Sequence, residues 1–165
     1  LFIRIKPPKE KVRVIGVWEL DPSKPMPRNT AEINRPLLHY RRGMEKESIQ
    51  VENISATGMA LRFPMEDLEI KPVDLDKGSQ LLCLIIYCMG KEEKIVTFWC
   101  TCKVLHARIH EGAEPALVLG TEFTNWAVLE QGKSDIHWFH SLQSRGVSPI
   151  TQWVMHMDME QRKRL

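Results

Sequence analysis

Apolar residues recur in short alternating runs along most of this chain, and loops of only a few polar residues separate the runs. Such alternation is typical of strands that bury one face. From Arg35 onward the runs are RPLLHYRR, SIQVEN, GMALRF, SQLLCLIIYCM, KIVTFWCTCKVLHARIH and ALVLGTEF. Sequential strands joined by short loops are antiparallel neighbours. The pattern therefore predicts a mainly β fold, with six antiparallel strands in a small barrel or sandwich that leaves few exposed edges.

The chain before residue 30 has a different pattern. It holds two strand-like pieces, FIRIK and KVRVIGVWEL, and then DPSKPMPRNT, which contains three of the ten prolines. A proline-rich stretch is typical of a linker or of an arm lying on a surface. We therefore expect an N-terminal extension over 1–30, which can be the end of an upstream module, and a barrel domain over 31–146.

The end of the chain has helical spacing. A first closing helix is predicted before Gly146, a residue suited to a C-terminal cap, by apolar residues at near-helical intervals: Leu129, Ile136, Phe139 and Leu142. Ser148 and Pro149 then suit the start of a second, amphipathic helix over 147–165. Its apolar stripe consists of Ile150, Trp153, Val154 and Met157. The stripe either packs on the barrel or, with Met155 and Met159 nearby, serves as a surface for a protein partner or a dimer.

Composition and charge narrow the function. The 23 basic and 21 acidic residues give a net charge of +2, too little to hold a nucleic-acid polymer by its backbone, so any bound anion must be caught by local arginines. No apolar run approaches the roughly 20 residues of a membrane span. The start of the chain has no signal-peptide pattern, and the four cysteines fall in strand-like runs. We expect a cytoplasmic domain.

The stretch VENISATGMALRF contains a polar knuckle between two strands, in which Asn53, Ser55 and Gly58 follow an Asn-x-Ser-x-x-Gly spacing. One interpretation is local: Asn and Ser side chains bond to nearby backbone amides, and Gly accepts a positive φ in a tight connection. A second interpretation is a ligand site, because the same residue types supply neutral hydrogen bonds and close backbone access.

The wider context of the knuckle resembles the PilZ family. A basic residue, Arg35, opens an earlier strand, and Leu119-Gly120-Thr121-Glu122-Phe123 and a predicted helix follow later, so that the similarity covers about two thirds of the chain, from Arg35 to Leu142. In that family an [Asp/Asn]-x-Ser-x-x-Gly motif, a late Gly-x-x-Phe strand and a closing helix come in this order around a six-stranded antiparallel barrel. The resemblance implies a receptor for the bacterial second messenger cyclic di-GMP, in which Asn53, Ser55 and Gly58 contact the ligand.

The chemistry of this ligand explains the residue types. Its two phosphates and two guanines call for arginines that bond in bidentate fashion and stack on bases. The family's Arg-x-x-x-Arg motif would end at Arg35, but Ala31 occupies the position of its first arginine. Arg28, on the proline-bounded arm, is the expected substitute, and an arm that orders over the ligand is the expected signal. The alternative is a degenerate PilZ-fold interaction module that does not bind the nucleotide.

Other clusters of potentially functional residues give weaker evidence of a site. The cysteines Cys83, Cys88, Cys100 and Cys102 resemble a four-thiolate zinc set, but small thiols on an apolar strand face are usually core residues. The histidine pairs His106/His110 and His137/His140 lack further metal ligands in a recognisable spacing. No catalytic motif is present, so we expect a binding domain with no resident cofactor or metal rather than an enzyme.

Overall fold

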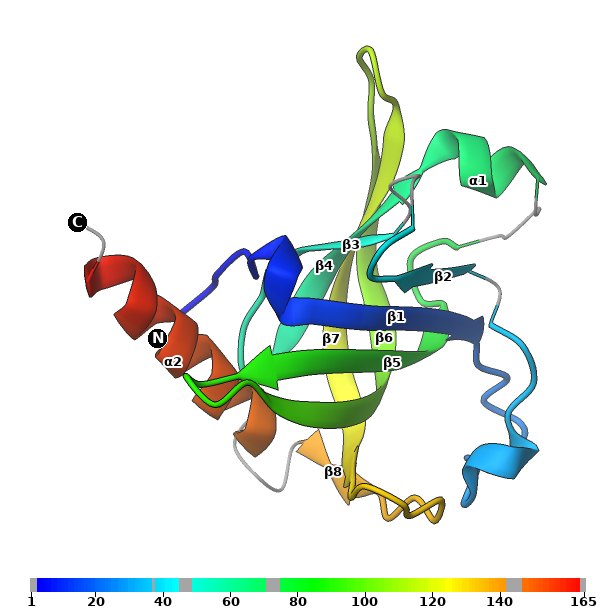
Figure 1. Ribbon diagram of the computed structural model, residues 1–165. Coiled ribbons are helices and arrows are strands. Elements are labelled where there is room, and N and C mark those ends of the chain that lie inside the picture. The colour runs from blue at the N-terminus through cyan, green and yellow to red at the C-terminus, as the bar shows by residue number, and fades with distance from the viewer. Residues whose placement is uncertain (1–2, 37, 45–48, 71–74, 142–146, 164–165) are drawn as a thin grey trace.

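The computed structural model describes residues 3–36, 38–44, 49–70, 75–141 and 147–163. In these residues the main element is one antiparallel sheet with the order β2-β1-β5-β6-β7-β4-β3, in which the short β8 also pairs with β7. The sheet curves into a half-barrel (Figure 1). Its strands are β1 (Val12–Glu19), β2 (Leu38–Arg41), β3 (Gln50–Ile54), β4 (Gly58–Pro64), β5 (Gln80–Met89), β6 (Lys94–His110), β7 (Ala116–Leu129) and β8 (Phe139–His140). The helices are η1 (Lys9–Lys11), η2 (Thr30–Glu32), α1 (Met65–Ile70) and α2 (Ser148–Lys163).

The predicted mainly β, antiparallel architecture is confirmed, and the six predicted strands correspond to β2 through β7. The sheet is larger than predicted, because β1 and β8 belong to it as well. β1 comes from the segment expected to be an extension, yet it pairs with both β2 and β5. The isolated bridge between Ile5 and Ile54 ties the chain before β1 to the sheet too. Residues before position 30 are therefore part of the same folded body.

The predicted helix ending near Gly146 is wrong over its described part. Leu129 ends β7, a turn with Gly132 at φ 79° follows, and Phe139 lies in β8. Ile136 is buried in a cluster on the sheet, and Phe139 stacks on Trp126 with ring centroids 4.8 Å apart. Each apolar residue thus has its own tertiary contact, and their near-helical spacing is coincidental. Leu142 and Gly146 lie outside the described residues.

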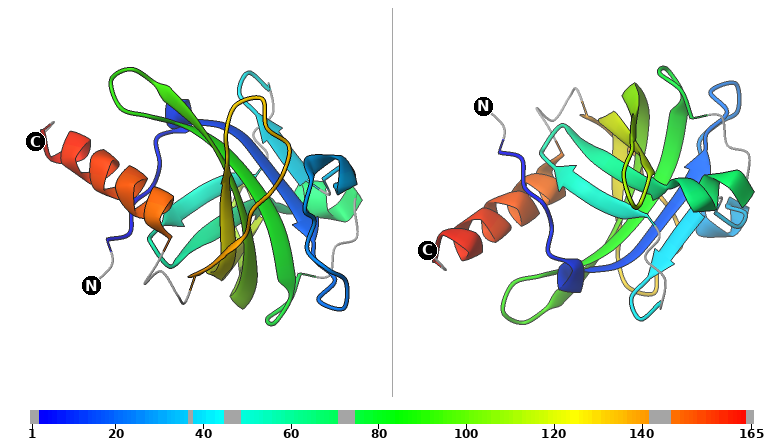
Figure 2. Two further views of the ribbon diagram at one scale, coloured as in Figure 1. Left: turned by 90° about the horizontal axis from the view of Figure 1, so that it is seen from below. Right: turned by 90° about the horizontal axis from the view of Figure 1, so that it is seen from above.

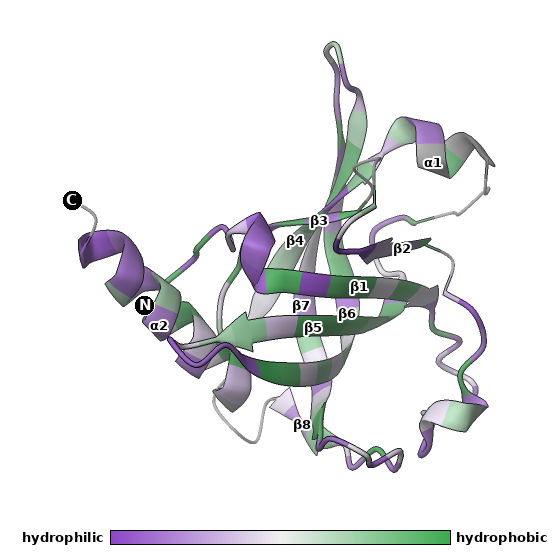
Figure 3. Ribbon diagram, viewed as in Figure 1, coloured by the Kyte–Doolittle hydropathy of each residue, from purple (hydrophilic) through white to green (hydrophobic). Residues whose placement is uncertain are grey.

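The second predicted helix is confirmed as α2, which crosses one end of the half-barrel (Figures 1 and 2). Its apolar stripe faces the inner side of the sheet, where Trp153 stacks on Tyr87 with centroids 4.0 Å apart. Figure 3 shows apolar residues along the strands and hydrophilic ones toward the C-terminal end of α2. All four residues of the stripe are buried: Ile150, Trp153, Val154 and Met157. The stripe therefore completes the core. Of the two interpretations of the stripe, the one in which it packs on the barrel matches the observed contact.

A second apolar cluster covers the outer face of the sheet. Its buried members are Leu82, Trp99, Ala127 and Ile136, and half-buried neighbours include Trp18 and Ile33. Residues 20–36, which we call the arm, lie over this face together with the loop 130–138. Within the described residues, no helix combines the length and apolar character needed to cross a membrane.

Candidate functional site

The knuckle, residues 53–58 between β3 and β4, is closed by its own polar groups. Ser55 is fully buried. Its backbone N–H donates to the carbonyl of Gly58 at 2.9 Å, and its hydroxyl lies 3.4 Å from that carbonyl. The hydroxyl also accepts from the Thr57 N–H at 3.3 Å. The Ser55 side chain thus fixes the turn from inside.

Gly58 is required by close packing between strands. It does not adopt a positive φ, so the conformational reason expected from the sequence is wrong. A Cβ at this position would overlap the carbonyl oxygen of Thr121 on β7. The knuckle also bonds to neighbours on two sides, because Thr57 accepts from the Phe123 N–H at 2.9 Å and Ala56 from the Val147 N–H at 2.8 Å.

Asn53 is the knuckle residue whose side chain reaches outward. Its Oδ1 accepts a hydrogen bond from the Arg4 guanidinium at 3.2 Å, and this contact is exposed. Arg4 is therefore a cation at the knuckle that the sequence analysis missed. The pairing of Ile5 with Ile54 places it there, and no local pattern signals a pairing of that sequence separation.

The arm that carries Arg28 and Arg35 is tied to the loop 130–138. The Arg28 carbonyl accepts from the Ile136 N–H at 2.8 Å, and the Thr30 N–H donates to the Ser134 carbonyl at 2.9 Å. The Trp138 indole N–H donates to the carbonyl of Pro27 at 2.7 Å. These hydrogen bonds fix the arm against the loop.

Side chains add further hydrogen bonds between the arm and the loop. The Asn29 amide donates to Asp135 Oδ1 at 2.9 Å and to Ser134 Oγ at 3.1 Å. Asn29 also caps the short helix η2 in a reciprocal arrangement with Glu32. At the far end of η2, the Trp18 indole N–H donates to the Asn34 carbonyl at 2.8 Å. The backbone on both sides of η2 is thus fixed, while Arg28 and Arg35 are exposed.

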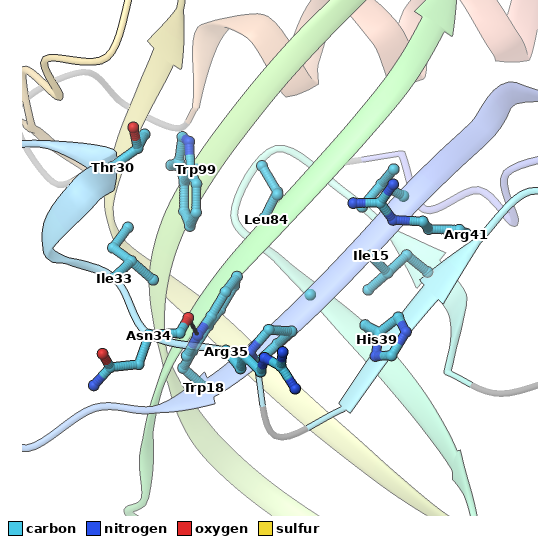
Figure 4. A pocket seen from close by; sticks show the side chains of 13 residues that line it. Ile15, Trp18, Thr30, Ile33, Asn34, Arg35, His39, Arg41, Leu84 and Trp99 are labelled. Atoms are coloured by element: carbon cyan, nitrogen blue, oxygen red, sulfur yellow. Dashed lines mark hydrogen bonds between the residues drawn. The ribbon is translucent and has the colours of Figure 1, made fainter.

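Arg35 lines a pocket of about 530 Å³ between the arm and the outer face of the sheet, which we call the arm pocket. Its wall is aromatic: Trp18 and Trp99 have ring centroids 5.4 Å apart. Gly16 makes room for this wall, since a Cβ there would come within 2.8 Å of the Trp18 indole. Figure 4 shows Arg35 between Trp18 and His39 in this view. The complete lining is Val14, Ile15, Gly16, Trp18, Thr30, Ile33, Asn34, Arg35, Pro36, His39, Arg41, Leu84 and Trp99.

The arm pocket combines positive charge with an aromatic wall. Arg35 and Arg41 both line it. Trp99 is buried, and its Nε1 has no hydrogen-bond partner in the part of the chain that the structure describes. The Nε1 atoms of Trp126 and Trp153 are buried without a partner in the described residues too, and all three atoms are shielded from the surface, so the Trp99 nitrogen does not mark a ligand site. The pocket suits a molecule with a flat ring and a negative charge.

A second pocket of about 570 Å³ adjoins the first and contains Arg28. The two pockets share Trp18, Ile33 and Asn34 as a common wall. Arg28, the expected substitute for the missing arginine, and Arg35 therefore line pockets on either side of one stretch of the arm.

The structure does not bring these arginines together with the knuckle. Arg35 lines a pocket with residues of β1, β2, β5 and β6. The knuckle bonds instead to Ile5 and to Val147, just before α2. The arm around η2 (light blue in Figure 1) and α2 (red) lie at opposite ends of the half-barrel in Figures 1 and 2.

Trp18 and Trp99 were missed by the sequence analysis, although a signal exists. Phe98 and Cys100 lie on the inner face, so Trp99 between them must point outward. In the same way, Trp18 follows the inward Val17. Two outward tryptophans on a sheet indicate a covered or ligand-binding outer face.

Three of the four cysteines form a cluster inside the half-barrel. Cys83 pairs across the hairpin with Cys100, and its Sγ lies 3.9 Å from that of Cys102. Hydrogen bonding from Cys100 and burial raise the pKa of Cys83 well above its ordinary value, and burial does the same for the pKa of Cys100. Cys88 lies apart, where its Sγ accepts from Arg13 Nε at 3.0 Å. Among the described residues, no three His, Cys, Asp or Glu side chains are arranged to hold a metal ion.

Comparison with models of protein families, with curated proteins and with solved structures finds no match to this chain. The resemblance to PilZ domains consequently rests on the sequence motifs alone.

Proposed function

We propose that this chain is a PilZ-type receptor domain that binds cyclic di-GMP in the arm pocket. The observation that carries the proposal is the meeting of Arg35 and Arg41 with the tryptophan wall in a pocket of about 530 Å³. Pockets of several hundred Å³ with an aromatic lining and a few polar groups are typical of small-molecule sites.

The chemistry of the ligand fits the lining. A guanine base stacks on the exposed part of Trp18, and the Arg35 guanidinium bonds to phosphate oxygens or to the O6/N7 edge of guanine. Arg41 lines the same pocket and adds a second positive charge. The knuckle then serves as structural support, and Asn53, Ser55 and Gly58 do not contact the nucleotide.

The arm provides the route from binding to signal. Arg28 and Arg35 lie on either side of a stretch that is hydrogen-bonded to the loop 130–138. A doubly anionic ligand draws both side chains toward itself and changes the strength of the hydrogen bonds between the arm and the loop. The state of the arm and of the loop then reports occupancy to a partner.

Calorimetric titration with cyclic di-GMP tests the proposal. We expect saturable heat that Arg35→Ala weakens about ten- to a hundred-fold, because charge-assisted hydrogen bonds contribute roughly 1.5–3 kcal/mol. Arg42→Ala is the matched control, since Arg42 is exposed but does not line the pocket. Ser55→Ala should leave the affinity unchanged as long as the variant remains folded.

Two results would contradict the proposal. Absence of heat at high nucleotide concentration removes the receptor function and favours the alternative, a nucleotide-independent interaction module. Binding that survives Arg35→Ala but is lost in folded Ser55→Ala returns the ligand to the knuckle. The alternative has one observation in its favour: α2 leaves Met155 and Met159 exposed after its stripe is buried.

A further inference from the structure

The helix α2 does not cover the inner face of the sheet completely. Beside its first turn lies a pocket of about 680 Å³, lined by the end of β5, the start of β6 and the end of β7. Tyr87 and Val96 in this lining are buried members of the inner cluster, and Met89 and Trp126 pack against that cluster. The pocket is therefore an open part of the half-barrel interior, and we call it the inner pocket.

The inner pocket leaves apolar surface exposed. Val128 lies opposite Phe98 of the inner cluster, so the two side chains share the inner face, yet Val128 is 40% exposed. Trp126, two residues earlier on the same face, is half-buried, and the stacked ring of Phe139 holds its indole in place. Pockets of several hundred Å³ with apolar and aromatic walls are typical of small-molecule sites.

The rim of the inner pocket has an excess of negative charge. Its charged lining residues are Glu93, Glu130 and Lys94, which set two carboxylates against one ammonium group. The whole chain, by contrast, has a net charge of +2, and the arm pocket is lined by Arg35 and Arg41. Because binding sites and their ligands have complementary charges, the inner pocket suits a cation rather than an anion.

The backbone conformation of one carboxylate residue supports this assignment. Glu93 is the one non-glycine residue of the described chain with a positive φ, at 50°. Glycine or asparagine is more usual in this conformation, and backbone strain of this kind is often retained where a side chain has a function. From α2, the lining receives Pro149 and Gln152. Pro149 has no N–H and the Gln152 amide is neutral, so the helix adds no charged side chain to the rim.

We propose that the inner pocket binds a small organic cation with an apolar body, of the alkylammonium class. The apolar body lies against Val128 and the indole of Trp126, and the ammonium group lies at the rim beside Glu93 and Glu130. Attraction between a cation and an aromatic ring adds to the affinity. This inference does not rest on the proposed nucleotide site, which lies on the outer face of the sheet.

Three probes of similar shape test the proposal: octylammonium, 1-octanol and octanoate. Each is titrated into the full chain below its micellar concentration and followed by calorimetry and tryptophan fluorescence. We expect octylammonium to bind most tightly and octanoate most weakly, because each exposed carboxylate contributes roughly two- to five-fold to the affinity for a cation. The difference between the probes should shrink at high salt, which screens exposed charges.

Neutral variants of the rim identify the carboxylates. Glu93→Gln and Glu130→Gln should each weaken octylammonium binding by roughly two- to five-fold and leave the affinity for 1-octanol unchanged. Lys94→Gln should strengthen octylammonium binding, because it removes the like charge. Glu92→Gln is the matched control, since Glu92 lies in the same turn but does not line the pocket.

A larger side chain at Val128 locates the apolar body. Val128→Phe narrows the pocket, so all three probes should bind more weakly to this variant. Ile109→Phe is its control, because Ile109 is 59% exposed on the long β6–β7 hairpin and does not line the pocket. This control should bind the probes like the parent chain.

Absence of binding for all three probes would overturn the inference. So would equal affinities for the three, tighter binding of octanoate than of octylammonium, or an octylammonium affinity that Glu92→Gln lowers as much as Glu93→Gln does. Binding that Val128→Phe leaves intact would place the probes elsewhere and overturn it as well. Circular dichroism of each variant separates loss of binding from loss of fold.

Discussion

At the scale of single residues, the knuckle shows how a ligand-like motif is used for folding. The Ser55 hydroxyl accepts a hydrogen bond from the Thr57 N–H and contacts the Gly58 carbonyl. Gly58 keeps β4 and β7 close, since any Cβ would strike the carbonyl of Thr121. The positions of Ser55 and Gly58 in the knuckle are therefore explained by hydrogen bonds within the turn and by the close packing of β4 on β7.

Gly58→Ala is predicted to lower the stability of the protein in the absence of any ligand. The added methyl group meets backbone rather than a flexible side chain, so β4 and β7 must separate, and overpacking of this kind costs about 1–3 kcal/mol. Urea denaturation measures the change. Thr57→Ala, in the same turn, is the control and should cost less, because Thr57 loses one 3.3 Å contact with Ser55. Equal stability of Gly58→Ala and the parent would rule out the packing role.

The residue types of the site could be predicted in part. The knuckle was identifiable from Asn53, Ser55 and Gly58 because turn chemistry is local. The contacts of Arg4 with Asn53 and of Trp18 with Trp99 depend on strand pairing over 49 and 81 positions of sequence. A local pattern contains no information about such pairings, so the aromatic wall of the arm pocket emerged only from the sheet.

At the scale of elements, α2 acts as the closing layer of the half-barrel. Its stripe is buried on the inner face, and the Trp153–Tyr87 stack joins it to β5. The same 3.6-residue period that predicted α2 failed for the segment around Ile136 and Phe139. There, tertiary contacts with the outer cluster and with Trp126 override the local spacing. A helical period is thus informative when it is regular over several turns, as in α2, and misleading when it is loose.

Trp153→Ala is predicted to destabilise the chain by about 3–5 kcal/mol, because it leaves a cavity between α2 and the sheet. Trp153→Phe should cost less: it keeps an aromatic ring on Tyr87 and removes a buried Nε1 that has no partner among the described residues. Thermal unfolding with urea titration measures both changes. Met155→Ala, on the exposed side of α2, is the control and should be close to neutral. A small effect of Trp153→Ala would show that α2 is only loosely attached.

At the scale of the whole molecule, one sheet carries apolar clusters on both faces. The inner cluster is closed by α2, and the outer one is covered by the arm and the loop 130–138. The alternation of the strands predicted a half-buried sheet, and the outward tryptophans were its exceptions. The order β2-β1-β5-β6-β7-β4-β3 also follows from long-range pairing, so the inclusion of β1 was beyond the reach of local patterns.

The stability of the whole molecule is predicted to fall in alkali through Tyr87. Burial raises the pKa of Tyr87 above its ordinary value, and its hydroxyl lies 3.4 Å from the carbonyl of Pro149 in the first turn of α2. A raised pKa in the folded state means that the phenol contributes stability fully below the unfolded pKa of about 10. That contribution is lost as the pH rises toward the folded pKa, at up to about 1.4 kcal/mol per pH unit for one proton.

Urea denaturation at several pH values above 10 measures this loss. Tyr87→Phe has no phenol to ionise, so its stability should depend less steeply on pH in this range than that of the parent, even if the missing hydroxyl lowers its stability at pH 7. Tyr40→Phe retains Tyr87 and should keep the steep dependence. Tyrosinate absorbance gives a second readout, because the Tyr87 phenol should ionise together with unfolding and not before it. Identical slopes for Tyr87→Phe and the parent chain would contradict the coupling of this buried phenol to the closing of the half-barrel by α2.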